Sequence, residues 1–235
     1  MDPQANATSG LGEDKTASTP TIYQVLLGEV SAESAVKPTK IPNLSLLSSN
    51  PELSGAEIEL ISIPEREFCL KKALEVLREK FDYIFIDCPP SLGLLTVNAL
   101  TASDFLLIPL QCEYYALEGL GQLLQTHSLV KKGLNPELEV GAVLLTMADF
   151  RTKLTEQVIS EVRNYFKEKV FDTVIPRSVR LGEAPSFGIP GVIYDRSARG
   201  AKSYVDAAEE FLKRFPTSKT KQNEEEIAAK GENRE

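Results

Sequence analysis

Apolar residues recur along this chain in two patterns, which together predict strands that alternate with helices. Short unbroken apolar runs are typical of strands that are buried on both faces of a sheet. The predicted strands lie at 83–87, which ends on Asp87, at 105–110 and 140–145, and at 170–175, which contains Asp172 and Thr173. Apolar residues three or four positions apart are typical of helices that bury one face. These helices lie at 94–100, 117–132, 154–166 and 201–212.

The first third of the chain is less regular and predicts a loop, short helices and one strand. Residues 2–12 are small and polar, as in a loop. Thr19 can cap a short helix that has Pro20 at its first position and ends at Gly28. The other elements predicted in this part are a strand at 41–48 and helices that begin at Pro51 and Pro64.

The alternation of strands with helices of about 10–15 residues indicates βαβ units. Right-handed crossovers in such units place helices on both faces of the sheet. The pattern therefore predicts an α/β fold with a mainly parallel sheet. We expect residues 1–215 to form one domain, and we expect the charged tail 216–235, which has no aromatic residue, to be disordered.

Composition adds limits on the class of protein. The chain has 235 residues, of which 42% are hydrophobic and 26% charged, as in ordinary globular proteins. No apolar run approaches the roughly 18 residues of a membrane helix, and the polar N-terminus is unlike a secretory signal. Three scattered cysteines predict reduced thiols in a cytoplasmic protein, and the single His127 lies in a helix pattern. The net charge of −8 argues against a surface that coats nucleic acid.

Asp87 is the first candidate for chemistry. It directly follows an apolar run, and Pro89 and Pro90 then end the predicted strand. We therefore expect Asp87 at the carboxyl end of a central parallel strand, the edge at which open α/β sheets bind ligands. A carboxylate there can hold Mg²⁺ directly or through water. The alternative is an acid that only caps the next turn.

Four segments, taken in order, resemble the ParA/MinD (Soj-like) ATPases, a deviant branch of the P-loop NTPases. They are Asp2-Pro3-Gln4-Ala5-Asn6, Asp87-Cys88-Pro89-Pro90-Ser91-Leu92-Gly93, 109–119 and 175–186. The resemblance runs from the first residue to about Phe215. It implies the doubly wound sheet of that branch, ATP and Mg²⁺ as cofactors, and ATP hydrolysis as the activity.

The same resemblance implies a Walker A phosphate loop ahead of the Asp-Pro-Gln segment, of the Lys-Gly-Gly-x-Gly-Lys-Thr kind. No glycine-rich loop with Lys-Thr or Lys-Ser occurs in these 235 residues. We therefore expect an N-terminally truncated domain that lacks the family's first strand, the phosphate-loop helix and most of the second strand. Without the loop's amides and lysine, we expect the chain alone to be inactive.

The resemblance also assigns roles to individual residues. Asp87 would associate with Mg²⁺, and Asp2 would orient the attacking water, although Asp2 could instead be a solvated residue in a turn. The switch would comprise Pro89, Pro90, Ser91 and Gly93, which otherwise form an ordinary loop. The residues expected near the nucleotide base are Met147, Pro176 and Arg177, which could instead only cover a core. Glu113 would contact the base side or the second subunit, or cap a helix.

Basic residues gather late in the chain. The candidates for DNA binding are Arg180, Arg196, Arg199 and Lys202, with Glu183 and Asp195 among them. A local basic patch can bind DNA phosphates without sequence preference. Charge alone favours a solvated surface, and the family resemblance is what favours non-specific DNA binding. No aromatic residues are interleaved, which disfavours stacking on single strands.

Three hypotheses about function follow. The first is a partitioning ATPase whose ATP-bound homodimer binds non-specific double-stranded DNA at the nucleoid and is stimulated by a ParB-like partner. The second is a non-catalytic module that docks on a full-length relative or on the partner. The third is a MinD-like membrane ATPase, which requires a basic amphipathic C-terminal helix. The mixed charges of 219–235 disfavour the third, so we expect no membrane association.

Overall fold

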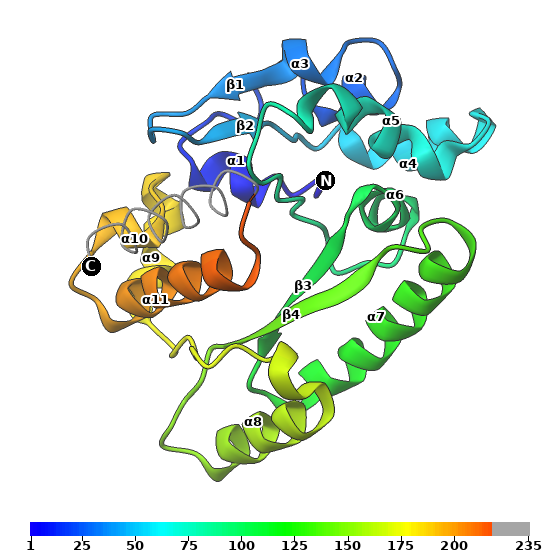
Figure 1. Cartoon of the computed structure of the whole chain (residues 1–235). Helices are drawn as coiled ribbons and strands as arrows, with labels where there is room; N and C mark the ends of the chain where they lie inside the picture. Colours follow the sequence, from blue (N-terminus) through cyan, green and yellow to red (C-terminus); the bar gives the residue numbers. More distant parts are fainter. Residues whose placement is uncertain (218–235) are drawn as a thin grey trace, which may run out of the picture.

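The computed structural model describes residues 1–217. Figure 1 shows an upper layer built from the first third of the chain and a lower layer in which helices surround a pair of strands. The strands of the lower layer are β3 (Phe105–Gln111) and β4 (Glu139–Thr146), which pair in parallel. The α/β class and the parallel pairing are therefore confirmed.

Helices cover both faces of β3 and β4 because side chains alternate along each strand. Val143 and Leu145 of β4 pack in a core with α7 (Tyr114–Gly133) and α8 (Lys153–Phe166). Ala142 and Leu144 point to the opposite face, where α11 (Arg199–Arg214) supplies Ala207 and Phe211. The predicted helices at 117–132, 154–166 and 201–212 are confirmed with small changes at their ends.

The predicted strand at 83–87 is wrong. This segment belongs to neither of the two sheets in residues 1–217, and Ile84 and Phe85 remain 40% and 68% exposed. Its aromatic side chains pack instead on α11, with the Phe85 and Phe211 ring centroids 5.3 Å apart. An apolar run predicts burial, but a strand also requires a neighbouring backbone to complete its hydrogen bonds, and none of the described segments lies there.

The predicted strand at 170–175 is reduced to isolated parallel bridges. Val170 pairs with Val143, and the amides of Phe171 and Ile175 donate to carbonyls of β4 at 2.9 Å. Between them, the amides of Asp172 and Thr173 donate to the Glu210 carboxylate of α11 instead, at 2.9 and 3.0 Å. A continuous ladder cannot form where the backbone turns toward a side chain.

The upper layer consists of short elements around one apolar core. They are α1 (Asn6–Gly10), α2 (Ile22–Leu26), α3 (Ala32–Ala35), β1 (Val36–Pro38), β2 (Ser45–Leu47), α4 (Leu53–Glu59) and α5 (Cys69–Leu74). α6 (Leu94–Ala102) joins this core to the lower layer and confirms the predicted helix at 94–100. α1 was missed because residues 2–12 have no apolar period, and α3 and β1 are also too short to show one.

Several boundaries in this layer differ from the prediction. Thr21, not Thr19, caps α2, and its side chain forms a capping box with Gln24. The predicted strand at 41–48 shortens to β2, which forms an antiparallel hairpin with β1. The helix predicted to begin at Pro64 starts at Cys69, after a 3-10 turn, because Asn98 of α6 hydrogen-bonds both the amide of Leu70 and the carbonyl of Arg66.

Two short helices, α9 (Val179–Glu183) and α10 (Gly191–Tyr194), connect the end of the lower layer to α11. They escaped prediction because four or five residues cannot show a helical period. No helix within residues 1–217 is both long and apolar enough to cross a bilayer. Residues 218–235, which carry most of the tail predicted to be disordered, lie outside the described part of the chain.

Candidate functional site

Two acidic residues that are far apart in sequence come together at the junction of the layers. Partial burial raises the pKa of the Asp87 carboxyl; the α-amino group of Met1 opposes this shift, and the nearby Asp2 carboxylate adds to it. Burial also raises the pKa of the adjacent Cys88 thiol to about 11, so Cys88 is a neutral thiol at pH 7. The predicted pair of acids therefore shares one small region.

Asp2 is fixed in place rather than solvated. Its side chain is only 9% exposed, and its Oδ1 accepts a 2.9 Å hydrogen bond from the amide of Gln4. Its carbonyl accepts a 2.7 Å hydrogen bond from the Ser49 hydroxyl, just after β2. The amide of Ser49 in turn donates to Thr8 of α1 at 2.9 Å. The solvated alternative for Asp2 is therefore wrong.

Asp87 differs from Asp2 in its surroundings. Asp87 is exposed, and no hydrogen bond to its carboxylate is found within residues 1–217. It does not cap the next helix, because α6 begins after Gly93 without a side-chain cap. A carboxylate with free acceptor sites at an open edge is a suitable single ligand for Mg²⁺, which keeps several waters when it is bound. No cluster of three or more metal-ligating side chains occurs among the described residues.

The segment Pro89–Gly93 leads from this pair of acids into α6. The Thr96 hydroxyl donates to the carbonyl of Ser91 at 2.6 Å, which fastens the segment at one point. Gly93 has a negative φ, so its conformation does not itself require glycine. A Cβ there would lie 2.2 Å from Oε1 of Glu57, but that is the end of a flexible side chain that can shift, so space does not require glycine either. Pro90 and Ser91 are exposed, as a loop that contacts a ligand requires.

The residues predicted near a nucleotide base also meet at the carboxyl edge of the strands. Pro176 pairs in parallel with Ala148, which follows Met147, and the amide of Arg177 donates to the carbonyl of Ala148 at 3.0 Å. Arg177 also forms a 3.1 Å ion pair with Glu113, which follows β3. Glu113 therefore pairs with Arg177 and does not cap α7 with its side chain. Met147 holds an uncommon positive φ of 54°, which directs the chain out of β4.

The basic candidates lie on α9, on the turn between α10 and α11 and at the start of α11, but they are not equally available. Arg180 forms ion pairs with Glu183 at 2.9 Å and with Asp195 at 3.5 Å. The Arg199 guanidinium lies over the ring of Phe150, 5.6 Å from its centroid. Arg196 and Lys202 are exposed and take part in no ion pair within residues 1–217.

Sequence reasoning missed three neighbours of these residues. Phe150 provides an aromatic surface for Arg199, and Arg151 beside it has a side chain that is 87% exposed although it pairs with Asp149. Glu57 contacts the start of α6 from α4. The Phe150–Arg199 and Glu57–Leu95 contacts join segments distant in sequence, so no local spacing could reveal them.

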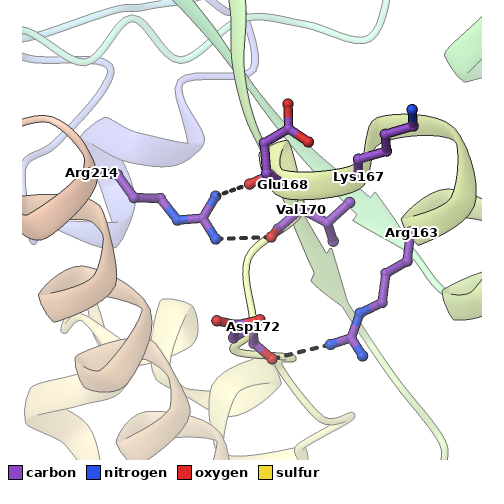
Figure 2. A pocket seen from close by; sticks show the side chains of 6 residues that line it. All are labelled: Arg163, Lys167, Glu168, Val170, Asp172 and Arg214. Atoms are coloured by element: carbon purple, nitrogen blue, oxygen red, sulfur yellow. Dashed lines mark hydrogen bonds between the residues drawn. The ribbon is translucent and has the colours of Figure 1, made fainter.

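A cavity of about 420 Å³ lies between α8 and α11, away from these residues. Figure 2 shows that Arg214 turns toward the chain that follows α8, where it donates to the carbonyls of Glu168 and Val170 at 2.7 and 2.9 Å. Arg163 donates to the carbonyl of Asp172 at 3.3 Å. These arginines join backbone segments, so we assign the cavity a structural role.

Comparison with known proteins agrees with the family resemblance of the four sequence segments. Residues 1–140 match the family model described as "AAA domain". The chain is 52% identical over 214 residues to the chromosome partitioning protein ParA of Myxococcus xanthus, covering 91% of this chain and 76% of that protein. It is 55% identical over 210 residues to the sporulation initiation inhibitor protein Soj of Bacillus subtilis, covering 89% and 83%.

Solved structures resemble the fold over most of its length. Cobyrinic acid a,c-diamide synthase of Mycobacterium smegmatis, bound to an ATP analogue and magnesium, is 36% identical with a TM-score of 0.77 and covers 92% of this chain and 83% of its own. A putative plasmid partition protein of Borrelia burgdorferi bound to AMPPNP is 26% identical with a TM-score of 0.75, covering 91% and 84%. The cell division ATPase MinD of Pyrococcus furiosus is 26% identical with a TM-score of 0.70, covering 89% and 81%.

Proposed function

Because the chain belongs to the ParA/Soj family of partitioning ATPases, we propose that its own residues supply the magnesium, water-positioning and DNA-binding groups of such an enzyme. The observation that carries the proposal is the meeting of Asp2 and Asp87 at the open end of the fold, close enough for one charge to shift the pKa of the other. Two carboxylates so placed can divide the tasks of holding a cation and orienting a water molecule.

Asp87 has the role of the magnesium-associated acid. Its carboxylate is partly exposed and accepts no hydrogen bond from the described residues. Its pKa is raised because partial desolvation and the nearby Asp2 carboxylate disfavour its charge. A divalent cation beside it would remove this penalty. Magnesium, when bound with ATP, supplies charge neutralisation at the phosphates.

Asp2 has the role of orienting the attacking water. The hydrogen bonds from Gln4 and Ser49 fix its backbone and one carboxylate oxygen. A carboxylate has about four acceptor sites, so the Gln4 amide leaves others to accept a proton from water. A rigid orientation is what a water-positioning residue needs, because its contribution depends on geometry.

The carboxyl edge of β3 and β4 would face the nucleotide base. Two contacts support this: Pro176 pairs with Ala148, the residue after Met147, and Arg177 forms an ion pair with Glu113. Arg196, Arg199 and Lys202 would contact DNA phosphates without reading sequence, and Arg180 would do so only by exchanging its carboxylate partners. An ATP-bound homodimer at the nucleoid and stimulation by a ParB-like partner complete the proposal.

The sequence contains no phosphate loop, so the decisive experiment adds one. A phosphate-loop segment of the kind the family resemblance implies is joined ahead of Met1, and Mg-ATP affinity, turnover and DNA retention are measured. We expect Asp2→Ala to lower turnover while nucleotide and DNA binding persist, because a water-orienting residue acts in the transition state. We expect Asp87→Ala to weaken Mg-ATP binding itself.

Charge reversal on the basic surface gives the complementary result. Arg199→Glu should abolish DNA retention at low salt and leave ATP affinity unchanged, and Glu209→Lys on the exposed side of α11 serves as the control for a charge change on the same helix. Loss of nucleotide binding in Asp2→Ala, or full DNA retention in Arg199→Glu, would show that the role of that residue is wrong.

The second candidate is a non-catalytic module that docks on a full-length relative or on the partner. The observation that favours it is the exposure of Ile84 and Phe85 in a segment that pairs with no strand of residues 1–217. Its test is association of the unmodified chain with a full-length relative, measured by sedimentation, in the absence of nucleotide. The MinD-like alternative depends on a C-terminal helix beyond residue 217, outside the described part of the chain.

A further inference from the structure

Two buried hydroxyls join segments of the upper layer that are far apart in sequence. Thr8 of α1 is 1% exposed, and Ser49, just after β2, is 6% exposed. The Thr8 hydroxyl accepts a 2.9 Å hydrogen bond from the amide of Ser49 and donates to the carbonyl of Ser49 at 3.3 Å. Because a buried polar group without a partner is costly, these two bonds fix the position of Ser49 against α1.

The hydroxyl of Ser49 extends this contact to Asp2. It donates to the carbonyl of Asp2 at 2.7 Å, and the amide of Ala5 donates to the same carbonyl at 3.0 Å. The amide of Gln4 donates to the Asp2 carboxylate at 2.9 Å. The bonds within the turn set its shape, whereas the Ser49 bond, which joins positions 47 apart, sets where the turn lies in the fold.

The segment that carries Ser49 is itself held on both sides. The carbonyl of Ser48 accepts a 2.9 Å hydrogen bond from the amide of Ile22 in α2. The carbonyl of Asn50 accepts a 3.2 Å hydrogen bond from the first amide of α4, and both Ser48 and Asn50 are buried. A support of this kind can hold a functional group to within about 0.5 Å, the tolerance that a reacting geometry requires.

We propose that Thr8 and Ser49 are positioning residues for the hydrolytic water, and that they act through the backbone of Asp2. The inference rests on the proposed function of Asp2 and extends it to two residues that carry no charge. Ser49 holds the turn of Asp2, and Thr8 holds Ser49. Loss of either hydroxyl therefore alters how Asp2 meets the water, and it leaves the groups that bind Mg-ATP in place.

Turnover is measured on the protein with a phosphate-loop segment joined ahead of Met1. Ser49→Ala and Thr8→Val should each lower kcat about tenfold and change KM for Mg-ATP by less than about twofold. Thr8→Ser keeps the hydroxyl and should retain most of the turnover. The control Ser103→Ala removes a hydroxyl that donates to a carbonyl at the same 2.7 Å, at the end of α6, and should change neither constant.

A double-mutant cycle separates positioning from general damage. Ser49→Ala should cause no further loss in an Asp2→Ala protein, because the residue through which it acts is gone. Equal loss in both backgrounds, or a rise in KM that accounts for the effect, would overturn the proposal. If Asp2→Ala keeps full turnover, the proposed function of Asp2 is wrong and this inference falls with it. If Asp2→Ala lowers turnover and Ser49→Ala does not, only this inference is wrong.

The unmodified chain gives a test that needs no nucleotide. The amides of Gln4 and Ala5 donate to Asp2, so their deuterium uptake reports whether the turn stays in place. Ser49→Ala should accelerate exchange at both amides about tenfold after correction for intrinsic rates, and Ser103→Ala should not. Unchanged exchange at Gln4 and Ala5 in Ser49→Ala would overturn the proposal.

Discussion

At the scale of single residues, the site is defined by how differently two carboxylates are held. Asp2 is buried and bonded through both its side chain and its carbonyl, whereas Asp87 is exposed and lies where its charge is disfavoured. Fixed geometry suits a residue that orients another molecule, and an unneutralised charge suits one that awaits a cation. The difference in surroundings thus distinguishes the proposed roles of two residues that are both aspartates.

The raised pKa of Asp87 predicts a particular dependence of stability on pH. Because the folded-state pKa lies above the ordinary value of 3.8, the unfolded chain releases this proton first as pH rises, and folding loses stability through that window. Above the folded-state pKa the penalty is fully present. Asp87→Asn should therefore raise the free energy of unfolding at pH 7 by less than about 1 kcal/mol, since solvent screens an exposed charge.

Urea unfolding at pH 4 and pH 7 checks this prediction. The gain should be smaller at pH 4, where more of the wild-type carboxyl is protonated than at pH 7. Asp206→Asn, which removes the same charge from the exposed side of α11, is the control and should change stability little at either pH. An Asp87→Asn protein that is less stable than wild type at pH 7 would contradict the proposed surroundings of Asp87.

At the scale of elements, short segments here depend on side-chain contacts more than on periodicity. The helix α2 has only five residues, yet Thr21 caps its start and Gln24 completes the capping box. The start of α5 is held by Asn98, a fully buried side chain of α6. Such elements are stable because specific polar groups satisfy their free amides and carbonyls.

Replacement of the α2 cap should therefore have a measurable cost. Thr21→Ala removes the acceptor for the Tyr23 amide and leaves a buried amide without a partner, so we expect a loss of about 1 kcal/mol in the free energy of unfolding. Ser18→Ala makes the same chemical change in the preceding loop, where the hydroxyl caps no helix, and should cost far less. Equal midpoints in urea for the two variants would show that the box does not stabilise α2.

The long elements could be predicted from sequence, and the short ones could not. α7, α8, α11, β3 and β4 each repeat their apolar period often enough to define the element. The strand prediction at 83–87 was wrong because apolar composition indicates burial but not whether a neighbouring strand is present to pair with. The Glu113–Arg177 ion pair joins two of the predicted site residues in a contact that the sequence did not predict, and Phe150 and Glu57 act across distant segments and had no local signal.

At the scale of the whole molecule, several linked aromatic side chains leave apolar surface open. Phe85 and Phe105 are 68% and 56% exposed and are linked through Phe211 and Phe215, with ring centroids 5.0 to 5.3 Å apart. The segment 83–87 pairs with no strand of residues 1–217. Exposed aromatic groups beside unpaired backbone are typical of surfaces that associate with other chains.

Phe85→Ser should therefore lower both dye binding and self-association of the purified chain. The change removes the most exposed of these rings while leaving the upper core intact, so anilinonaphthalene sulfonate fluorescence should fall and sedimentation should show fewer oligomers. Tyr165→Ser, at a ring on α8 that is 70% exposed, is the matched control. A wild-type chain that is monomeric and binds no dye would contradict this prediction.

Nucleotide affinity is also a property of the whole molecule. We expect the 235-residue chain to show no Mg-ATP dissociation constant in the micromolar range, since most charge-matched phosphate contacts in such sites come from loop amides and a lysine. Isothermal titration calorimetry measures it directly. A micromolar constant would mean that Asp87 and Arg177, without the loop, hold the nucleotide by contacts other than those proposed.

The carboxylate of Glu210 offers a way to observe when the last helix leaves the rest of the protein. The amides of Asp172 and Thr173 donate to it, so their deuterium uptake should be slow while α11 is docked and should accelerate together when it detaches. Burial opposes its ionisation, but the amide hydrogen bonds lower its pKa overall, so the protection is fully present above its ordinary value of 4.5 and is lost as pH falls through the folded-state value. After correction for intrinsic exchange, Glu210→Gln should expose both amides at neutral pH, while Glu209→Gln should not. Deuterium uptake at these two amides therefore reports how often α11, which begins at the proposed DNA-binding surface, detaches from the rest of the protein.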